Sequence, residues 1–132
     1  MNPFFTRIYN QALAVEGIGY DQLCGVGYRK ALEFLIKDYC ISKNPDRSDE
    51  IKKKFLGTCI DSFVTDPNTK SCAKRATWLG NDETHYNREW TALGVQDLKT
   101  LIQLTLYWIS SEILTKQYEH GMKNLTETDK PK

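Results

Sequence analysis

Apolar residues recur three and four positions apart through most of the chain, which is the spacing of one face of an α-helix. The pattern contains no pair of alternating strands. It predicts helices at about residues 3–16, 21–42, 49–64, 67–79 and 95–120. Short polar connections between successive helices favour antiparallel neighbours. The predicted fold is therefore all-α, an antiparallel bundle of about five helices packed around the second and the last.

Several residues are expected to mark the ends of these helices. Asp21 and Ser48 are candidate N-caps of the second and third helices, because their side chains can accept a hydrogen bond from a free backbone N–H. Gly80 follows the fourth helix and is expected to be its C-terminal cap. Residues 81–93 then form a polar and aromatic connection to the last helix.

The second helix has an apolar arc and a charged stripe on opposite sides. Asp38 falls inside the apolar arc, where a carboxylate either ends the buried stretch or meets a polar partner in the core. The arc consists of Cys24, Tyr28, Ala31, Phe34, Leu35 and Tyr39.

The last helix is apolar nearly all round at residues 101–109. A helix of this kind lies at the centre of a bundle or is covered by another chain. Monomers tend to avoid large exposed apolar patches, and symmetric pairing covers the same patch on both copies. We therefore predict a two-fold homodimer with this helix in the interface; the alternative is that the first and third helices wrap it. The side chains that lie partly off its inner stripe are Leu104, Tyr107 and Trp108.

Length and charge limit the protein class. The 132 residues fit one domain, expected at 1–120, followed by a polar tail at 121–132. The totals of 18 basic and 17 acidic residues argue against a broad nucleic-acid-binding face but leave a local patch open. No apolar run approaches the ~18 residues needed to cross a bilayer, and the N-terminus lacks a signal-peptide pattern. We expect a cytoplasmic protein without membrane contact.

The four cysteines show no metal or redox pattern. The closest pair, Cys59 and Cys72, is 13 residues apart, so the chain has no C-x-x-C motif. Four reduced cysteines packed among apolar residues of a cytoplasmic protein are expected instead.

Candidate chemistry concentrates at residues 76–86, ATWLGNDETHY, which include one of the two histidines. The favoured interpretation is structural: Asn81 or Asp82 satisfies loose backbone groups, and His85 hydrogen-bonds into the bundle. Asp38 is then a possible partner of His85, as are the hydroxyls of Tyr28 and Tyr39, and Asp38 and His85 are assigned to a structural polar core.

A second interpretation is a binding site for RNA, a nucleotide or a protein partner. It uses the same segment together with the basic residues before it: Lys70, Lys74, Arg75, Asn81, Asp82, Glu83, His85 and Tyr86. A metal ion is not expected because no second histidine lies near His85, and no cofactor is implied.

Two motifs together resemble a known family. Residues 27–35, GYRKALEFL, and 78–86, WLGNDETHY, are similar to a bacterial family of helical domains of unknown function, found alone or fused to restriction-endonuclease and other defence modules. The resemblance covers roughly residues 4–118. It implies an HEPN-like helical bundle and a defence or nucleic-acid-processing context.

Many HEPN bundles are metal-independent ribonucleases, and this relationship implies a third, catalytic interpretation. Their motif R-x(4–6)-H has an arginine, a neighbouring polar residue and a histidine at a dimer cleft. Asn81 and His85 match the last two, but Gly80 stands where the arginine is expected, and Arg75 is ten residues before His85. Without a cation the site lacks a stabiliser of the pentavalent phosphate. The sequence therefore favours a non-catalytic, homodimeric interaction or binding module over a ribonuclease.

Overall fold

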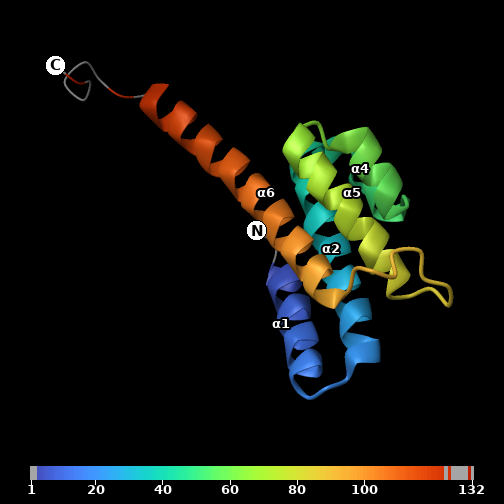
Figure 1. Ribbon diagram of the computed structural model, residues 1–132. Coiled ribbons are helices and arrows are strands. Elements are labelled where there is room, and N and C mark those ends of the chain that lie inside the picture. The colour runs from blue at the N-terminus through green and yellow to red at the C-terminus, as the bar shows by residue number, and fades with distance from the viewer. Residues whose placement is uncertain (1–2, 124, 126–130, 132) are drawn as a thin grey trace.

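The computed structural model describes residues 3–123, 125 and 131. The described residues form six α-helices and a short 3-10 helix, with no strand among them, which confirms the all-α prediction. The elements are α1 (Pro3–Gly17), α2 (Asp21–Lys43), η1 (Pro45–Arg47), α3 (Ser48–Lys53), α4 (Leu56–Phe63), α5 (Pro67–Asp82) and α6 (Val95–Lys123) (Figure 1).

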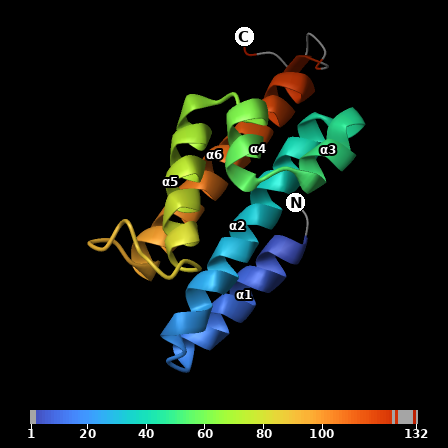
Figure 2. The ribbon, with the colours of Figure 1, turned by 90° about the vertical axis from the view of Figure 1, so that its right-hand side faces the viewer.

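Helix α2 is the centre of the bundle. It packs against every other α-helix, and α1 runs back along its first half in the opposite direction (Figure 2). Its buried side is wider than the predicted arc, because a second apolar row lies beside the first. The added row consists of Leu32, Ile36 and Cys40. A helix buried over so wide an arc can hold neighbours on several sides, and this positions α5 and α6.

The helix predicted at 49–64 is two helices, α3 and α4, so the count of five was one too low. The chain is extended at Lys54 and Phe55, with ψ angles of 153° and 147°. This two-residue break changes the register between the helices, so Ile51 and Leu56 are both buried. Phe55, between the two helices, is 87% exposed.

The N-cap positions of α2 and α3 lie one residue earlier in the chain than predicted. Tyr20 and Arg47 occupy the N-cap positions of α2 and α3, and neither makes a capping hydrogen bond through its side chain. Asp21 and Ser48 lie in the first turns instead. The carboxylate of Asp21 there still interacts favourably with the positive end of the helix dipole.

Helix α6 lies at the edge of the bundle, so its predicted central position was wrong. It packs mainly on α5 and α2, and its second half stands clear of the other helices (Figure 1). Its buried residues are all in the first half: Leu98, Ile102, Thr105 and Ile109. α6 continues to Lys123, and most of the predicted tail at 121–132 lies outside the described residues. No described helix, α6 included, has the length and apolar character to cross a membrane.

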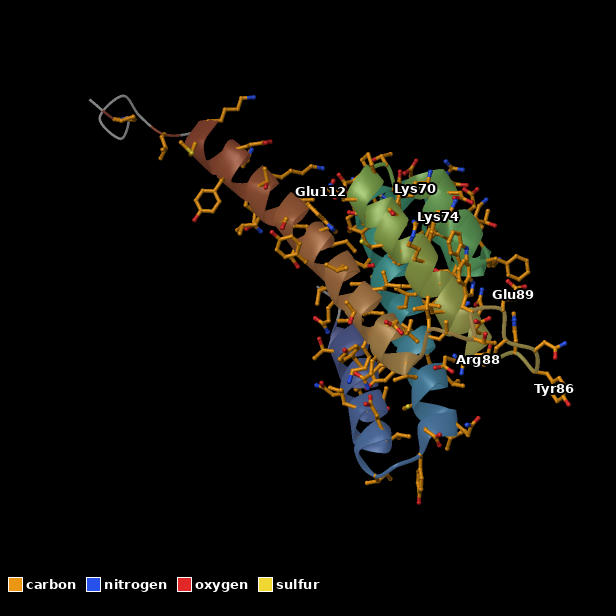
Figure 3. The ribbon with its side chains drawn as sticks, in the orientation of Figure 1. Lys70, Lys74, Tyr86, Arg88, Glu89 and Glu112 are labelled. Atoms are coloured by element: carbon orange, nitrogen blue, oxygen red, sulfur yellow. The ribbon has the colours of Figure 1, made fainter. Side chains whose placement is uncertain are left out.

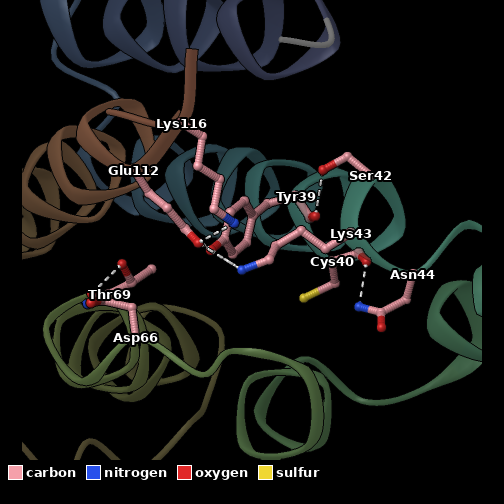
Figure 4. A network of polar contacts seen from close by, with 9 residues as sticks. All are labelled: Tyr39, Cys40, Ser42, Lys43, Asn44, Asp66, Thr69, Glu112 and Lys116. Carbon is pink, nitrogen blue, oxygen red and sulfur yellow. Dashed lines mark hydrogen bonds and ion pairs between the residues drawn. The ribbon is translucent and has the colours of Figure 1, made fainter. Parts of the chain in front are cut away.

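A polar network marks where α6 leaves the bundle (Figure 4). The Glu112 carboxylate accepts a hydrogen bond from the Tyr39 hydroxyl of α2 and lies 2.7 Å from the Lys43 Nζ. Lys116, one turn further along α6, lies 3.2 Å from the same carboxylate. Beyond this network the described residues of α6 are exposed.

Candidate binding site

Helix α5 carries most of the predicted site residues. It starts at an N-cap, Asp66, whose carboxylate accepts a hydrogen bond from the Thr69 N–H at 2.8 Å. It does not end at Gly80, as predicted, but continues to Asp82 with Glu83 as its C-cap. Asn81 therefore belongs to the last turn of a helix and not to the connecting segment.

Gly80 is needed for a close contact between α5 and α2. A Cβ built at this position would lie 2.8 Å from the Cγ of Arg29, which is too close for two carbon atoms. The missing side chain lets Arg29 cross α5, and its Nε donates a hydrogen bond to the Asn81 Oδ1 at 3.2 Å. The cation beside Asn81 therefore comes from α2, and neither Lys74 nor Arg75 supplies it.

His85 is exposed, so its assignment to a polar core was wrong. Its backbone N–H donates to the Asn81 carbonyl at 3.1 Å, which places it one turn beyond the end of α5. Asp38 is nine residues beyond Arg29 on α2, about 13 Å along the helix axis. It is partly buried and lines a different pocket, between α2 and Ile113 of α6. The predicted pairing of Asp38 with His85 is therefore not formed.

Asp82 accepts hydrogen bonds from loose backbone groups, as the structural interpretation predicted for Asn81 or Asp82. Asp82 is only 4% exposed, and both of its carboxylate oxygens accept backbone hydrogen bonds from the following loop. The donors are the N–H groups of Glu89, at 3.1 Å, and Trp90, at 2.7 Å. These bonds hold Trp90 against Trp78 of α5, with ring centroids 5.7 Å apart and ring planes 4° apart.

The predicted basic residues of α5 interact with the chain itself. Figure 3 shows Lys70 and Lys74 on this helix. The Lys70 Nζ donates to the Asp61 carbonyl at 3.3 Å, and the Lys74 Nζ lies 3.0 Å from the Asp61 carboxylate, both on the α4 side. Arg75 points elsewhere: it donates to the Ser71 Oγ at 2.8 Å and lies over the Trp78 ring. The three cations therefore do not form one patch.

Glu83 and Tyr86, which both follow the end of α5, point in different directions. Glu83 packs on Gly25 of α2, where a Cβ would lie 2.6 Å from its Cδ, and its carboxylate is 3.8 Å from Arg88. Tyr86 is fully exposed on the loop, which Figure 3 shows leading away from the bundle. Glu83 therefore fastens the loop to α2, whereas Tyr86 contributes no packing.

Three pockets share Asn81 and His85 among their lining residues, and two of them also contain Trp78. The α4–α5 pocket has a volume of about 540 Å³ and is lined by Arg29, Phe55, Leu56, Gly57, Thr58, Asp61, Lys74, Thr77, Trp78, Asn81 and His85. The tryptophan pocket has a volume of about 240 Å³ and is lined by Trp78, Asn81, Asp82, His85, Glu89 and Trp90. Lys70, Arg75, Glu83 and Tyr86, although predicted for the site, line neither pocket.

The charges of the α4–α5 pocket are largely balanced. Lys74 is paired with Asp61, and the Arg29 guanidinium forms an ion pair with Glu33. Burial alone would raise the pKa of Glu33, but hydrogen bonds from Arg29 and Lys37 outweigh it and lower the pKa. A phosphate would have to compete with these carboxylates, which does not favour a nucleotide- or RNA-binding site.

Metal ligation and likeness to known proteins add no further assignment. Among the described residues, no group of three His, Cys, Asp or Glu side chains is placed to hold a metal ion. No family model matches the chain, and neither does any curated protein or solved structure. The resemblance to the bacterial helical family and to HEPN bundles therefore stays a prediction from the two motifs.

Proposed function

We propose that the protein is a non-catalytic helical interaction module that pairs with a second copy of itself through α6. The observation that carries this proposal is an apolar stripe on the face of α6 turned away from the bundle. Its members are Leu104, Tyr107, Leu114, Tyr118 and Met122, all of them exposed, Tyr118 by 65%. The bacterial defence or nucleic-acid-processing context implied by the resemblance is part of the proposal.

The stripe has the spacing of a helix pair. Its members and Ser111 follow one another at intervals of three or four residues, the repeat by which two helices pack along a seam. At 100° per residue they fall within about 80°, opposite the buried row that contains Ile102 and Ile109. One helix face therefore packs on the bundle, while the other is shaped for a partner.

Charge along α6 points to a second copy as the partner. The charged side chains of the projecting half lie on the other side of the helix from the stripe: Glu112, Lys116, Glu119 and Lys123. The stripe itself is uncharged, so two copies can meet face to face without opposing like charges. An antiparallel two-fold pairing covers both stripes at once.

Light scattering after size-exclusion chromatography at micromolar concentration tests the pairing. We expect a dimer of twice 15.3 kDa, and a monomer after Leu114→Glu with Tyr118→Glu, with the helical content unchanged. Lys123→Glu, on the charged side of α6, is the matched control and should remain dimeric. A wild-type monomer would refute the proposal, and a dimer that survives the double substitution would refute its surface.

A second candidate, metal-independent RNA cleavage, is supported by the position of Arg29. The sequence lacked a cation next to Asn81, and the structure places Arg29 there, with His85 lining the same pocket. In this function His85 would take the proton of the 2′-hydroxyl as its oxygen bonds to the phosphorus. The bond from phosphorus to the 5′-oxygen would break, the leaving oxygen would take a proton from water, and Arg29 would stabilise the charge on the phosphate. The ion pair of Arg29 with Glu33 weighs against it.

Cleavage of labelled RNA in the presence of EDTA tests the second candidate. If it holds, wild-type protein cleaves, while His85→Ala and Arg29→Lys lose most of the activity. His120→Ala, which removes the other histidine, should cleave like wild type. Absence of cleavage by the wild-type protein would exclude this function and leave the pairing proposal untouched.

A further inference from the structure

The tryptophan pocket is built from two indoles presented at the surface. Trp78 and Trp90 stack on each other and remain 39% and 41% exposed. The backbone N–H of Trp90 donates a hydrogen bond to Asp82, so the position of Trp90 does not depend on its stacking against Trp78 alone. Exposed, preorganised aromatic rings provide much contact area at little cost in conformational entropy.

The same pocket carries negative charge without a counter-ion. Asp82 and Glu89 both line it, and among the described contacts neither forms an ion pair. The nearest cation along the loop, Arg88, is engaged elsewhere: it pairs with Glu83 and donates to the Leu93 carbonyl at 3.1 Å. Two carboxylates beside two indole rings favour a cation and disfavour a phosphate.

The chain itself shows which kind of cation fits an indole here. The guanidinium of Arg75 lies over the Trp78 ring, 5.6 Å from its centroid. A guanidinium is planar, is weakly hydrated, stacks on aromatic rings and can bind a carboxylate with two hydrogen bonds. A lysine ammonium has none of the first three properties.

We propose that the tryptophan pocket binds a guanidinium group, stacked on the exposed indoles and paired with the Glu89 carboxylate. The ligand is an arginine side chain of a partner polypeptide or a small guanidino compound; both share this chemistry. The site lies on the loop and the end of α5, away from the α6 stripe, so it does not depend on self-association. Figure 3 shows Glu89 on the loop that leaves α5.

NMR of the indole N–H groups tests the proposal, because the chain has 3 tryptophans and the third, Trp108, is on α6. The probe is N-acetyl-arginine amide, and N-acetyl-citrulline amide is the uncharged control of the same shape. We expect the signals of Trp78 and Trp90 to shift with the arginine compound alone, and that of Trp108 to stay. A Gly-Arg-Gly peptide that binds more tightly than the single residue identifies a polypeptide ligand, and equal binding identifies a small one.

Glu89→Gln tests the carboxylate. Its backbone N–H still reaches Asp82, so the loop is kept, and we expect binding about tenfold weaker, the loss of one charge-assisted contact. Glu119→Gln, an exposed site on α6, should bind like wild type. Equal shifts with arginine and citrulline compounds, or unchanged affinity of Glu89→Gln, would overturn the proposal, and so would the absence of any shift with millimolar ligand.

Discussion

Replacing Asp82 by alanine should release the loop that follows α5. The change removes an acceptor that is 4% exposed and serves two backbone donors, Glu89 and Trp90. A hydrogen bond to a charged group contributes about 1.5–3 kcal/mol to stability. Water reaches the freed N–H groups on this exposed loop and recovers part of the loss. We therefore expect Asp82→Ala to lower the free energy of unfolding by about 2–4 kcal/mol.

The asparagine variant separates charge from shape. Asp82→Asn keeps one carbonyl oxygen, so one of the two backbone bonds can persist, but its NH₂ group faces the second donor. We expect a loss of about 1–2 kcal/mol, which is smaller than that of the alanine variant. Glu119→Ala, at an exposed position of α6, is the control and should change stability by less than about 0.5 kcal/mol.

Urea unfolding followed by circular dichroism gives the free energies, and hydrogen exchange of the Glu89 and Trp90 amides reports on the loop itself. In the wild type both amides should be protected, because their hydrogen bonds must open before exchange. In Asp82→Ala both should exchange faster. If the two amides keep their wild-type protection and the stability is unchanged, Asp82 does not hold the loop, and the geometry described for the tryptophan pocket loses its support.

Three further predictions concern Gly80, Glu112 and His85. Gly80→Ala should lower the free energy of unfolding by about 1–3 kcal/mol in the same urea experiment, because the added Cβ meets Arg29. Gly57→Ala is the control and should not lower it, because a Cβ at that position meets no atom within 4 Å. Equal effects of the two substitutions would contradict the close contact at Gly80. Burial alone would raise the pKa of Glu112, but hydrogen bonds from two lysines and a tyrosine lower it from 4.5 to about 2. Because the folded pKa lies below the ordinary one, this stabilisation is present above about pH 4.5 and is lost as the pH falls toward 2. Glu112→Gln should therefore cost about 1–2 kcal/mol at pH 7 and much less at pH 3, and a cost independent of pH would refute the ionic contribution. His85→Ala should change stability by less than about 0.5 kcal/mol, because the side chain is exposed, and a thermal melt that shifts by several degrees would show a contact of this side chain.

The helices were largely predictable because each buries a face whose spacing is visible in the sequence. α1 and α2 end within one residue of the predicted positions, since glycine or polar turn residues follow them. The break between α3 and α4 was not predictable in this way. Ile51, Phe55 and Leu56 all fit one apolar face, and periodicity cannot show that two extended residues turn one of them to solvent.

Only part of the site was predictable, because its residues come from two distant segments of the chain. Asn81 and Arg29 are 52 residues apart, and the resemblance identified both motifs without placing them in contact. Gly80 was interpreted from the local sequence as the end of a helix. In the structure a glycine is needed there for a tertiary contact, because a side chain would collide with Arg29. Two signals for this contact were available in the sequence. Gly80 stands next to the predicted site residue Asn81, and the motif at residues 27–35 contains one arginine, Arg29.

The two proposed surfaces lie on opposite sides of the molecule, and this has a consequence for binding. Figure 1 places the projecting half of α6 on one side of the bundle and the loop after α5 on the other. Pairing through α6 would therefore leave both tryptophan pockets of the dimer open. Two pockets on one dimer would bind a partner with two arginine segments more tightly than a single pocket can, provided the segments span both sites. Because the surfaces are separate, Leu114→Glu with Tyr118→Glu should abolish this gain without weakening the binding of a single arginine compound. Glu89→Gln should have the opposite effect: it should weaken the binding of an arginine compound at each pocket, while the dimer persists.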